Sequence, residues 1–215
     1  ASVDPFSDVV LAAPVSNVAL VLVVRADSPW KSLAELLEDA RRNSGKLSYG
    51  TPGVATPMHL IMELVKQQAK ADLIHVPYKG GPLVISDVIA GQVSLGVLAY
   101  GPAAGLIQQG RLRALASAGS LRLSMLPDVP AVAETVPEAS FGAWTALVAP
   151  KGTPRDICAE LARQVQTVFK RPEVADRLRP MGVELLAGSD ESVLASARAE
   201  HARFGEIIKR LNLKV

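Results

Sequence analysis

Short apolar runs that favour β-strands alternate with helical segments along almost the whole chain. The clearest run, Val18-Ala19-Leu20-Val21-Leu22-Val23-Val24, contains no polar residue. Both faces of such a strand must be covered, as they are in the middle of a sheet packed by helices. A helix with apolar residues at helical spacing follows from Ser28 to about Ala40, and Asn43-Ser44-Gly45 ends it. The repeated order of strand and helix predicts an α/β fold with largely parallel sheets.

The same order continues to the C-terminus. Further strands are expected at 46–49, 73–76, 93–98, 112–116, 144–149 and 183–186, and further helices at 57–69, 82–90, 102–108, 154–169, 173–181 and 192–211. The segment 124–138 is rich in proline and acidic residues, and it predicts a loop with one short helical turn. No internal repeat interrupts this order.

Composition excludes several classes of protein. The 215 residues correspond to one large domain or two small ones, and 49% hydrophobic residues are enough for a packed core. The 23 basic and 21 acidic residues are scattered and give a net charge of only +2, so a nucleic-acid partner is not expected. The most apolar stretch runs from Val9 to Val24, and its unbroken part, Val18 to Val24, is far shorter than the ~20 residues of a spanning helix. The chain is therefore not expected to span a membrane. No basic residue precedes that stretch, so it is not expected to be a signal peptide.

Motifs for catalysis, metal or cofactor binding are missing from the sequence. The single cysteine, Cys158, allows neither an intramolecular disulfide nor a multi-thiolate zinc site, and it is expected to be a buried helix residue. The histidines His59, His75 and His201 have no metal-ligand spacing. There is neither a G-x-S-x-G elbow nor a G-x-G-x-x-G fingerprint. We therefore expect no catalytic residue, no metal and no cofactor.

The segment from Gly50 to His59 offers a place for an anion. It joins a strand to a helix, with Thr56 suited to the N-cap and Pro57 to the first helical position. The N–H groups of Met58 and His59 then lack intrahelical partners, and the helix dipole adds positive potential. Gly50 and Gly53 would let a ligand approach the backbone. The alternative is that Thr56 caps its own helix and nothing binds, and these residues alone leave both possibilities open.

A second strand-to-helix segment, from His75 to Pro82, follows the same logic. Tyr78 offers a hydroxyl group and a ring face, and Gly80-Gly81 offers accessible N–H groups. Lys79 is more simply a solvated residue, and it is not a Walker lysine because no Ser or Thr follows it.

Six ordered motifs resemble one family, the substrate-binding proteins of tripartite tricarboxylate transporters, also called the Bug-type family. The matching segments are Gly45-Lys46-Leu47-Ser48-Tyr49-Gly50-Thr51 with His59-Leu60, His75-Val76-Pro77-Tyr78-Lys79-Gly80, Gly91-Gln92-Val93, Gly110-Arg111-Leu112-Arg113-Ala114-Leu115-Ala116, Leu126-Pro127-Asp128-Val129-Pro130 and Ala149-Pro150-Lys151-Gly152-Thr153-Pro154. The resemblance runs from about Asp4 to the C-terminus.

The resemblance implies a periplasmic receptor of Venus-flytrap type that is not an enzyme. Two α/β lobes would close on a small organic acid and present it to a membrane permease or a signalling partner. Residues 26–143 would form the complete second lobe, and residues 1–25 and 144–215 would be the remainder of the first. The chain would cross between the lobes near 24–27 and 141–144.

The resemblance also implies the ligand-binding residues. They lie on the two strand-to-helix segments: Gly50, Thr51, Pro52, Gly53, Val54, Ala55, Thr56, Met58, His59, Tyr78, Lys79 and Gly80.

The sequence departs from the family pattern in three places. It lacks the family's early Pro- and Gly-rich loop, so the first lobe is expected to be truncated and to expose sheet edge and apolar surface. Ala55 replaces a glycine that is often found in the loop, and Leu98-Ala99 replaces polar residues, which favours a ligand less polar than a typical dicarboxylate, or a loss of binding.

Two alternative functions stay open at this point. The first is an effector-sensing domain of a transcription regulator, which uses a similar two-lobed build. A DNA-binding motif encoded upstream of Ala1 would favour it, and a secretion signal there would exclude it. The second is a two-lobed enzyme, which no catalytic motif supports.

Overall fold

The computed structural model describes residues 4–139, 142–186, 190–210 and 212–213. The chain forms two compact units, which are described separately. Unit 1 comprises Ala1–Val18 and Trp144–Arg203, and unit 2 comprises Ala19–Ala143 and Phe204–Val215.

Unit 2 is built on a five-stranded sheet with the order β4-β3-β5-β2-β6. The strands are β2 (Leu20–Arg25), β3 (Ser48–Thr51), β4 (Ile74–Pro77), β5 (Leu95–Ala99) and β6 (Leu112–Ser117). Strands β4, β3 and β5 are parallel, whereas β2 runs antiparallel to both β5 and β6. The expected central strand is therefore confirmed, with every residue from Leu20 to Val24 buried, but the sheet is mixed rather than largely parallel.

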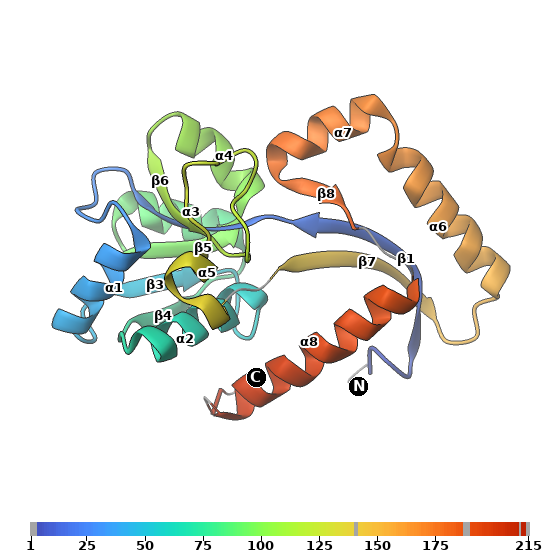
Figure 1. Cartoon of the computed structure of the whole chain (residues 1–215), viewed down its shortest axis with the longest axis horizontal. Coiled ribbons are helices and arrows are strands. Elements are labelled where there is room, and N and C mark those ends of the chain that lie inside the picture. Colours follow the sequence, from blue (N-terminus) through green and yellow to red (C-terminus); the bar gives the residue numbers. More distant parts are fainter. Residues whose placement is uncertain (1–3, 140–141, 187–189, 211, 214–215) are drawn as a thin grey trace. The chain divides into compact units, whose positions relative to one another are not determined.

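Helices cover both faces of this sheet. They are α1 (Leu33–Arg42), α2 (Pro57–Ala69), α3 (Gly81–Ala90) and α4 (Tyr100–Gln108), followed by the short α5 (Val132–Thr135) and the 3₁₀ turn η1 (Pro137–Ala139). Successive residues of a strand point to opposite faces. Tyr49 points toward α2, where it contacts Glu63, and the missing Cβ of Gly50 points toward Val84 of α3. Helices α3 and α4 (green) thus lie on one face and α2 (teal) on the other (Figure 1).

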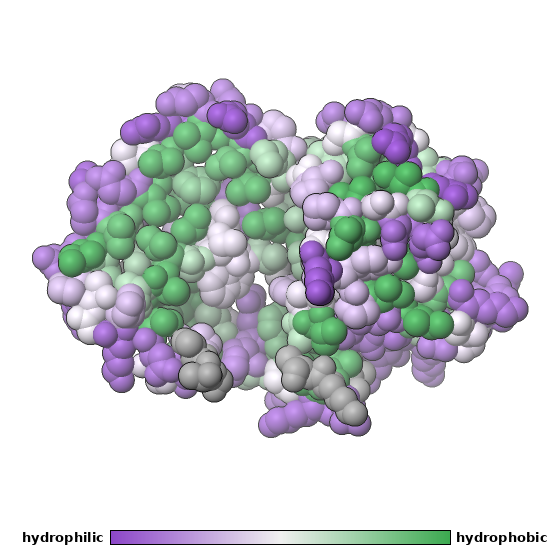
Figure 2. Space-filling view, turned by 180° about the vertical axis from the view of Figure 1, so that it is seen from behind, coloured by the Kyte–Doolittle hydropathy of each residue, from purple (hydrophilic) through white to green (hydrophobic). Residues whose placement is uncertain are grey.

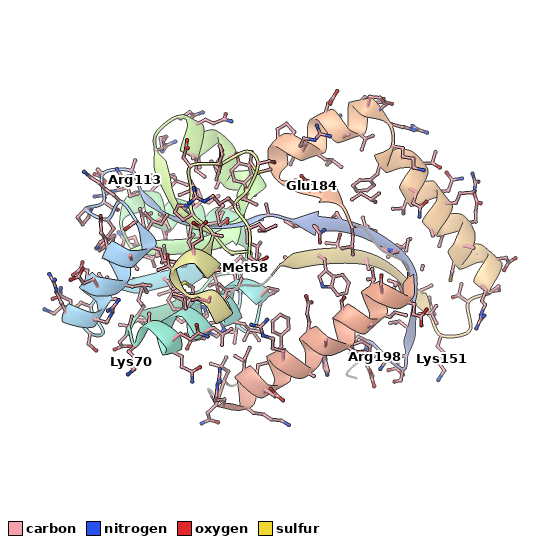
Figure 3. All side chains as sticks on the ribbon, in the orientation of Figure 1. Met58, Lys70, Arg113, Lys151, Glu184 and Arg198 are labelled. Atoms are coloured by element: carbon pink, nitrogen blue, oxygen red, sulfur yellow. The ribbon has the colours of Figure 1, made fainter. Side chains whose placement is uncertain are left out.

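Arg113 on β6 stabilises the turn between β2 and α1. Its guanidinium donates hydrogen bonds to the carbonyl oxygens of Ala26, Ser28 and Trp30, the last two at 3.0 and 2.9 Å. Figure 3 labels this half-buried side chain. The fork of five donors on arginine suits such a cluster of carbonyl groups, which a lysine would satisfy less completely.

Unit 1 contains a three-stranded sheet with the order β7-β1-β8. The strands are β1 (Val9–Val18), β7 (Ala143–Pro150) and β8 (Val183–Leu185), and the helices are α6 (Arg155–Phe169), α7 (Pro172–Leu178) and α8 (Asp190–Arg210), with a 3₁₀ turn η2 (Arg179–Met181). β1 and β8 are antiparallel, which again departs from the parallel arrangement expected. The indole N–H of Trp144 donates to Glu200 of α8 at 2.7 Å and ties β7 to that helix.

The helices of unit 1 bury little of their apolar surface. No residue of α6 or α7 is fully buried, and Ile157 and Val168 are 49% and 39% exposed. Cys158, expected to be buried, is half-buried because α6 is only partly covered. Apolar side chains gather on the face of this unit that is seen in Figure 2, consistent with the exposed Leu147, Val148 and Leu185 of its strands.

The compact units divide the chain differently from the expected lobes at two places, at the first crossing and at residue 204. The first crossing lies between Val18 and Ala19 rather than near 24–27, because β2 pairs with β5 and β6 and belongs to their sheet. The strand β1 was missed for the same reason, since only one strand was expected in this stretch. The second crossing, between Ala143 and Trp144, falls within the expected 141–144. Residues 204–215 are grouped with unit 2, whereas they were expected in the other lobe.

Among the helices of the described residues, none combines the length and the apolar character that a membrane span requires.

Candidate functional site

Three strand-to-helix turns meet at one edge of the sheet of unit 2. β3, β4 and β5 are parallel and lead into α2, α3 and α4, with Gly50 opposite Val76 and Gly96 in the register. The amide of Tyr78 donates to the carbonyl oxygen of Thr51 at 2.9 Å, which brings the first two turns side by side. Ligands of open α/β sheets bind outside the carboxyl ends of the strands, so this edge is the candidate site. Of the third turn, the sequence singled out only Leu98-Ala99, and α4 begins there at Tyr100 rather than at the expected Pro102.

The predicted site residues occupy the first two turns. Gly50 and Thr51 end β3, Pro52 to Thr56 form the loop, Met58 and His59 lie in the first turn of α2, and Tyr78, Lys79 and Gly80 join β4 to α3. The structure therefore brings all twelve to one edge of the sheet, although it does not direct all of them outward.

Hydrogen bonds hold the loop 52–56 from its inner side. The hydroxyl groups of Thr51 and Thr56 both donate to the carbonyl oxygen of Gly53, at 3.0 and 2.9 Å. The amide of His59 donates to the Thr56 hydroxyl at 3.4 Å, so Thr56 caps its own helix. The amide of Ala55 donates to Nδ1 of His59 at 3.0 Å. The expectation of a free His59 amide was wrong, because the N-cap side chain accepts from it.

Other amides of the first turn have no acceptor among the described residues. They include those of Val54, whose side chain is exposed, and of Met58, the second residue of α2. Figure 3 labels Met58 where α2 begins. The amide of Met58 stays free because it lies in the first turn of α2, where no intrahelical acceptor exists, and because the Thr56 hydroxyl accepts from His59 instead. The amides of Val54 and Met58 therefore give this turn its potential for binding an anion.

In the second turn, Tyr78 does not offer its hydroxyl group to a ligand. The hydroxyl donates to Asp87 of α3 at 2.7 Å, and burial, followed by the Asp87 carboxylate, raises the pKa of Tyr78 to about 12. A Cβ at Gly50 would lie 2.9 Å from the ring of Tyr78, so this glycine makes room for that ring and not for a ligand. Both residues shape the turn from within.

The backbone beside Tyr78 is more open. Gly80 has φ +119°, which glycine adopts without strain, and no side chain caps α3. The amides of Lys79 and Gly80 have no acceptor among the described residues, and the Lys79 side chain is exposed. The second turn therefore adds two free amides to those of the first.

Beneath the first turn lies a stack of rings that the sequence analysis missed. His59 and His75 stack with ring centroids 3.7 Å apart, and Tyr49 stacks on His75 at 4.9 Å. Glu63 of α2 accepts hydrogen bonds from the Tyr49 hydroxyl and from Lys66. The spacing of His59, Glu63 and Lys66 on one helical face was the only signal in the sequence, and it gave no hint of the two strands that supply the other rings.

The two stacked histidines are uncharged at neutral pH. Burial lowers the pKa of His59. Burial, followed by the proximity of His59, lowers the pKa of His75 to about 4. Burial and the Glu63 carboxylate raise the pKa of Tyr49. These rings therefore form a neutral packing layer on which the loop rests.

The low pKa of His75 makes unit 2 sensitive to acid. Below pH 6.5 the unfolded chain binds a proton at this residue, whereas the folded chain does so only near pH 4, so stability falls as the pH falls through this window. We expect the free energy of unfolding to drop by about 1–2 kcal/mol from this residue between pH 7.5 and pH 5. Urea denaturation at both pH values measures the drop. His75→Gln, which keeps a donor toward Thr51 and does not titrate, should show a smaller drop; an equal drop would assign the effect to other groups.

The described residues contain no group of three His, Cys, Asp or Glu side chains that could hold a metal ion.

Comparison with known proteins assigns this architecture to a family. The model of the tripartite tricarboxylate transporter family receptors matches residues 2–213. A relative from a Pseudomonas species, the UPF0065 protein in the tcbD-tcbE intergenic region, is 34% identical over 210 residues, which are 97% of this chain and 62% of that protein. A UPF0065 protein of Bordetella bronchiseptica is 31% identical over 211 residues, 98% of this chain and 62% of that protein. The chain thus spans less than two thirds of the length of these relatives.

Solved structures share the fold over nearly the whole chain. A structure described as a periplasmic transporter has 31% identity and a TM-score of 0.90, and it covers 99% of this chain and 71% of its own. Rpa4515 of R. palustris, solved with adipate, has 29% identity and a TM-score of 0.90 over 98% of this chain and 71% of its own. The periplasmic binding protein BugD has 25% identity and a TM-score of 0.85 over 96% of this chain and 70% of its own.

The expected resemblance and the expected two-lobed α/β fold of periplasmic binding proteins are thereby confirmed. The family is described as one of receptors. The chain belongs to the tripartite tricarboxylate transporter family receptors.

Proposed function

We propose that this protein is a periplasmic receptor that binds a small organic carboxylate. The observation that carries the proposal is a group of free amides, which includes those of Val54, Met58, Lys79 and Gly80, on two neighbouring turns at the carboxyl edge of the sheet. Membership of a receptor family adds the biological setting.

A carboxylate suits these amides for physical reasons. The N–H groups at a helix start point toward the ligand, and the helix dipole adds roughly half a positive charge there. Hydrogen bonds to a charged group contribute about 1.5–3 kcal/mol each, more than those to a neutral acceptor. Two adjacent turns, each with its own helix, would thus favour an anion over a neutral molecule of the same shape.

The ligand class follows from the same chemistry and from a relative. Rpa4515, at 29% identity, was solved with adipate, a flexible dicarboxylate with an apolar centre. The loop here presents the exposed, apolar Val54, and Ala99, the last residue of β5, brings no polar side chain to the third turn. We infer a carboxylate that carries an apolar segment, with its charged end at the amides.

Met58 allows the proposal to be tested on a single atom. Met58→Pro removes the amide hydrogen in the first turn of α2, where no intrahelical hydrogen bond is lost, whereas Met58→Ala keeps it and removes only the side chain. A proline also disfavours the helical conformation of the residue before it, so hydrogen exchange along α2 verifies that the helix still begins at Pro57. Titration calorimetry with adipate should give an affinity that is lower by about tenfold or more for Met58→Pro, which corresponds to one charge-assisted hydrogen bond. Met58→Ala should remain within about threefold of the wild type.

The control ligand is adipamide, which has the same length without charge. It should bind much more weakly than adipate, because neutral amide oxygens gain less from the dipole and from the N–H groups. Equal binding of adipate and adipamide, or equal losses in the two Met58 variants, would contradict recognition of an anion by these amides. No heat with adipate or with a panel of other mono- and dicarboxylates would reject the receptor proposal.

We further propose the partner that the family description suggests. The loaded receptor would deliver its ligand to the membrane permease of a tripartite tricarboxylate-type transporter or to a signalling partner. Growth on the carboxylate, lost on deletion of the gene and restored by the wild type but not by Met58→Pro, tests this delivery.

A further inference from the structure

We propose that His59 is a positioning residue of the carboxylate site, which holds the loop 52–56 from beneath as a neutral hydrogen-bond acceptor. Its Nδ1 atom accepts from the amide of Ala55, and this bond fixes the turn that carries the free amides of Val54 and Met58. The inference rests on the proposed function, because it concerns the same turn.

Ala55 is the point at which the loop needs support. Its φ of +56° is the left-handed conformation, which costs an alanine roughly 1–2 kcal/mol. The conformation persists because its amide points inward to His59 at 3.0 Å. If that bond is lost, Ala55 is free to return to negative φ. The amides on either side, those of Val54 and Met58, would then no longer be held in one orientation.

The imidazole of His59 is itself held in place. It is buried, it stacks on His75 at 3.7 Å between ring centroids, and Nε2 of His75 lies 2.7 Å from the Thr51 hydroxyl. That hydroxyl donates to the carbonyl oxygen of Gly53, so it accepts from the Nε2–H of His75. The two histidines therefore hold the two halves of the same loop, one through Gly53 and the other through Ala55.

Only the neutral imidazole can serve as this acceptor. A proton on Nδ1 would set an N–H group against the N–H of Ala55 and break the bond. Among the described side chains, the titratable groups around the ring are Tyr49 on β3, His75 on β4, and Glu63 and Lys66 on α2. Burial of the ring keeps His59 neutral at pH 7, so the acceptor is in place under ordinary conditions.

Two variants whose new side chains are of nearly equal size distinguish a positioning role of His59 from a packing role. His59→Asn keeps an acceptor, because Oδ1 of asparagine stands where Nδ1 of histidine stands along the side chain, and it does not titrate. His59→Leu fills the same space without an acceptor. Both remove the stacked ring, so loss of packing affects them alike. Urea denaturation of both variants verifies that each one folds.

The first measurement needs no ligand. Amide hydrogen exchange at Ala55 should be at least tenfold faster in His59→Leu than in the wild type, and within about threefold of the wild type in His59→Asn. In the wild type, exchange corrected for its intrinsic pH dependence should accelerate as acid protonates His59, whereas His59→Asn should show a weaker acceleration, which comes from His75 alone. The difference between the pH profiles of the wild type and His59→Asn decides the question even where His59→Leu does not fold, because titration of His75 acts on both proteins.

The second measurement is the titration with adipate. His59→Leu should bind at least tenfold more weakly, and His59→Asn should restore most of the affinity. Equal Ala55 exchange in the wild type and His59→Leu, or equal losses in both variants, would overturn the positioning role. Failure of the wild type to bind any carboxylate would instead overturn the proposed function, while the exchange at Ala55 would still decide whether His59 holds the loop.

Discussion

Replacing Gly96 by valine is expected to destabilise unit 2 by about 3 kcal/mol. Gly96 lies on β5, and a Cβ added there would stand 2.9 Å from a methyl group of Val88 and 3.1 Å from atoms of Val84 and Leu98. All three neighbours are buried, so none of them can move aside without disturbing the contact between α3 and the sheet. Because α3 carries part of the candidate site at its start, carboxylate affinity should fall as well.

Gly105 is the matched control for this substitution. It lies within α4, and nothing stands within 4 Å of the position of an added Cβ. Gly105→Ala should therefore stabilise the protein by about 0.5–1 kcal/mol through helix propensity. Urea denaturation of both variants measures the difference. A cost below about 1 kcal/mol for Gly96→Val would mean that α3 does not pack closely on β5.

Amides of α6 are expected to exchange with solvent at least 100-fold faster than those of α1. Both helices are strongly amphipathic, but Leu33, Leu36, Leu37 and Ala40 of α1 are buried, whereas α6 has no fully buried residue. The free energy of local opening is lower where less apolar surface is buried. Each fully buried leucine side chain raises it by about 1.5–3 kcal/mol. The free energy of local opening is therefore expected to be several kcal/mol higher for α1 than for α6.

Hydrogen exchange followed by mass spectrometry resolves peptides from the two helices in one experiment. Strand β2, which is buried along its length from Leu20 to Val24, supplies the slow reference. Similar protection of α6 and α1 would contradict the expectation and would mean that the exposed face of α6 is covered in solution, for example by self-association. A dependence of α6 exchange on protein concentration distinguishes that case.

The sequence predicted most of the elements but not the pairing of the strands. The run 18–24 was read correctly as a buried strand from Leu20 on, since no polar residue interrupts it, whereas Val18 ends β1. Its direction relative to its neighbours depends on β5 and β6, which lie far away in the chain, so no local pattern could reveal it. The strand β1 was missed because Pro14, Ser16 and Asn17 interrupt its apolar residues, and only the pairing within the three-stranded sheet identifies it as a strand.

The candidate site, like the fold, was predicted only in part from the sequence. Thr56 as N-cap and Pro57 in the first turn are local signals, and they placed the start of α2 correctly. Which amides stay free was not predictable, because the amide of Ala55 is taken by the side chain of His59 and Tyr78 is turned inward by Asp87. His59 lies on α2 and His75 on the following strand, β4. The spacing of the two residues in the sequence does not reveal that their rings stack.

By itself, the sequence determined the order of strands and helices, the two turns that lead from β3 and β4 into α2 and α3, and the resemblance to a receptor family. These features depend on hydrophobic periodicity, capping residues and glycines, which act within one turn of helix or strand. Only the tertiary structure decided that Gly50 makes room for Tyr78, and that Val54 and Met58 keep their amides free on a loop that His59 and His75 hold from beneath. Those outcomes depend on contacts between segments that are brought together only when the sheet forms, because burial and side-chain hydrogen bonding are properties of the packed core and not of the local chain.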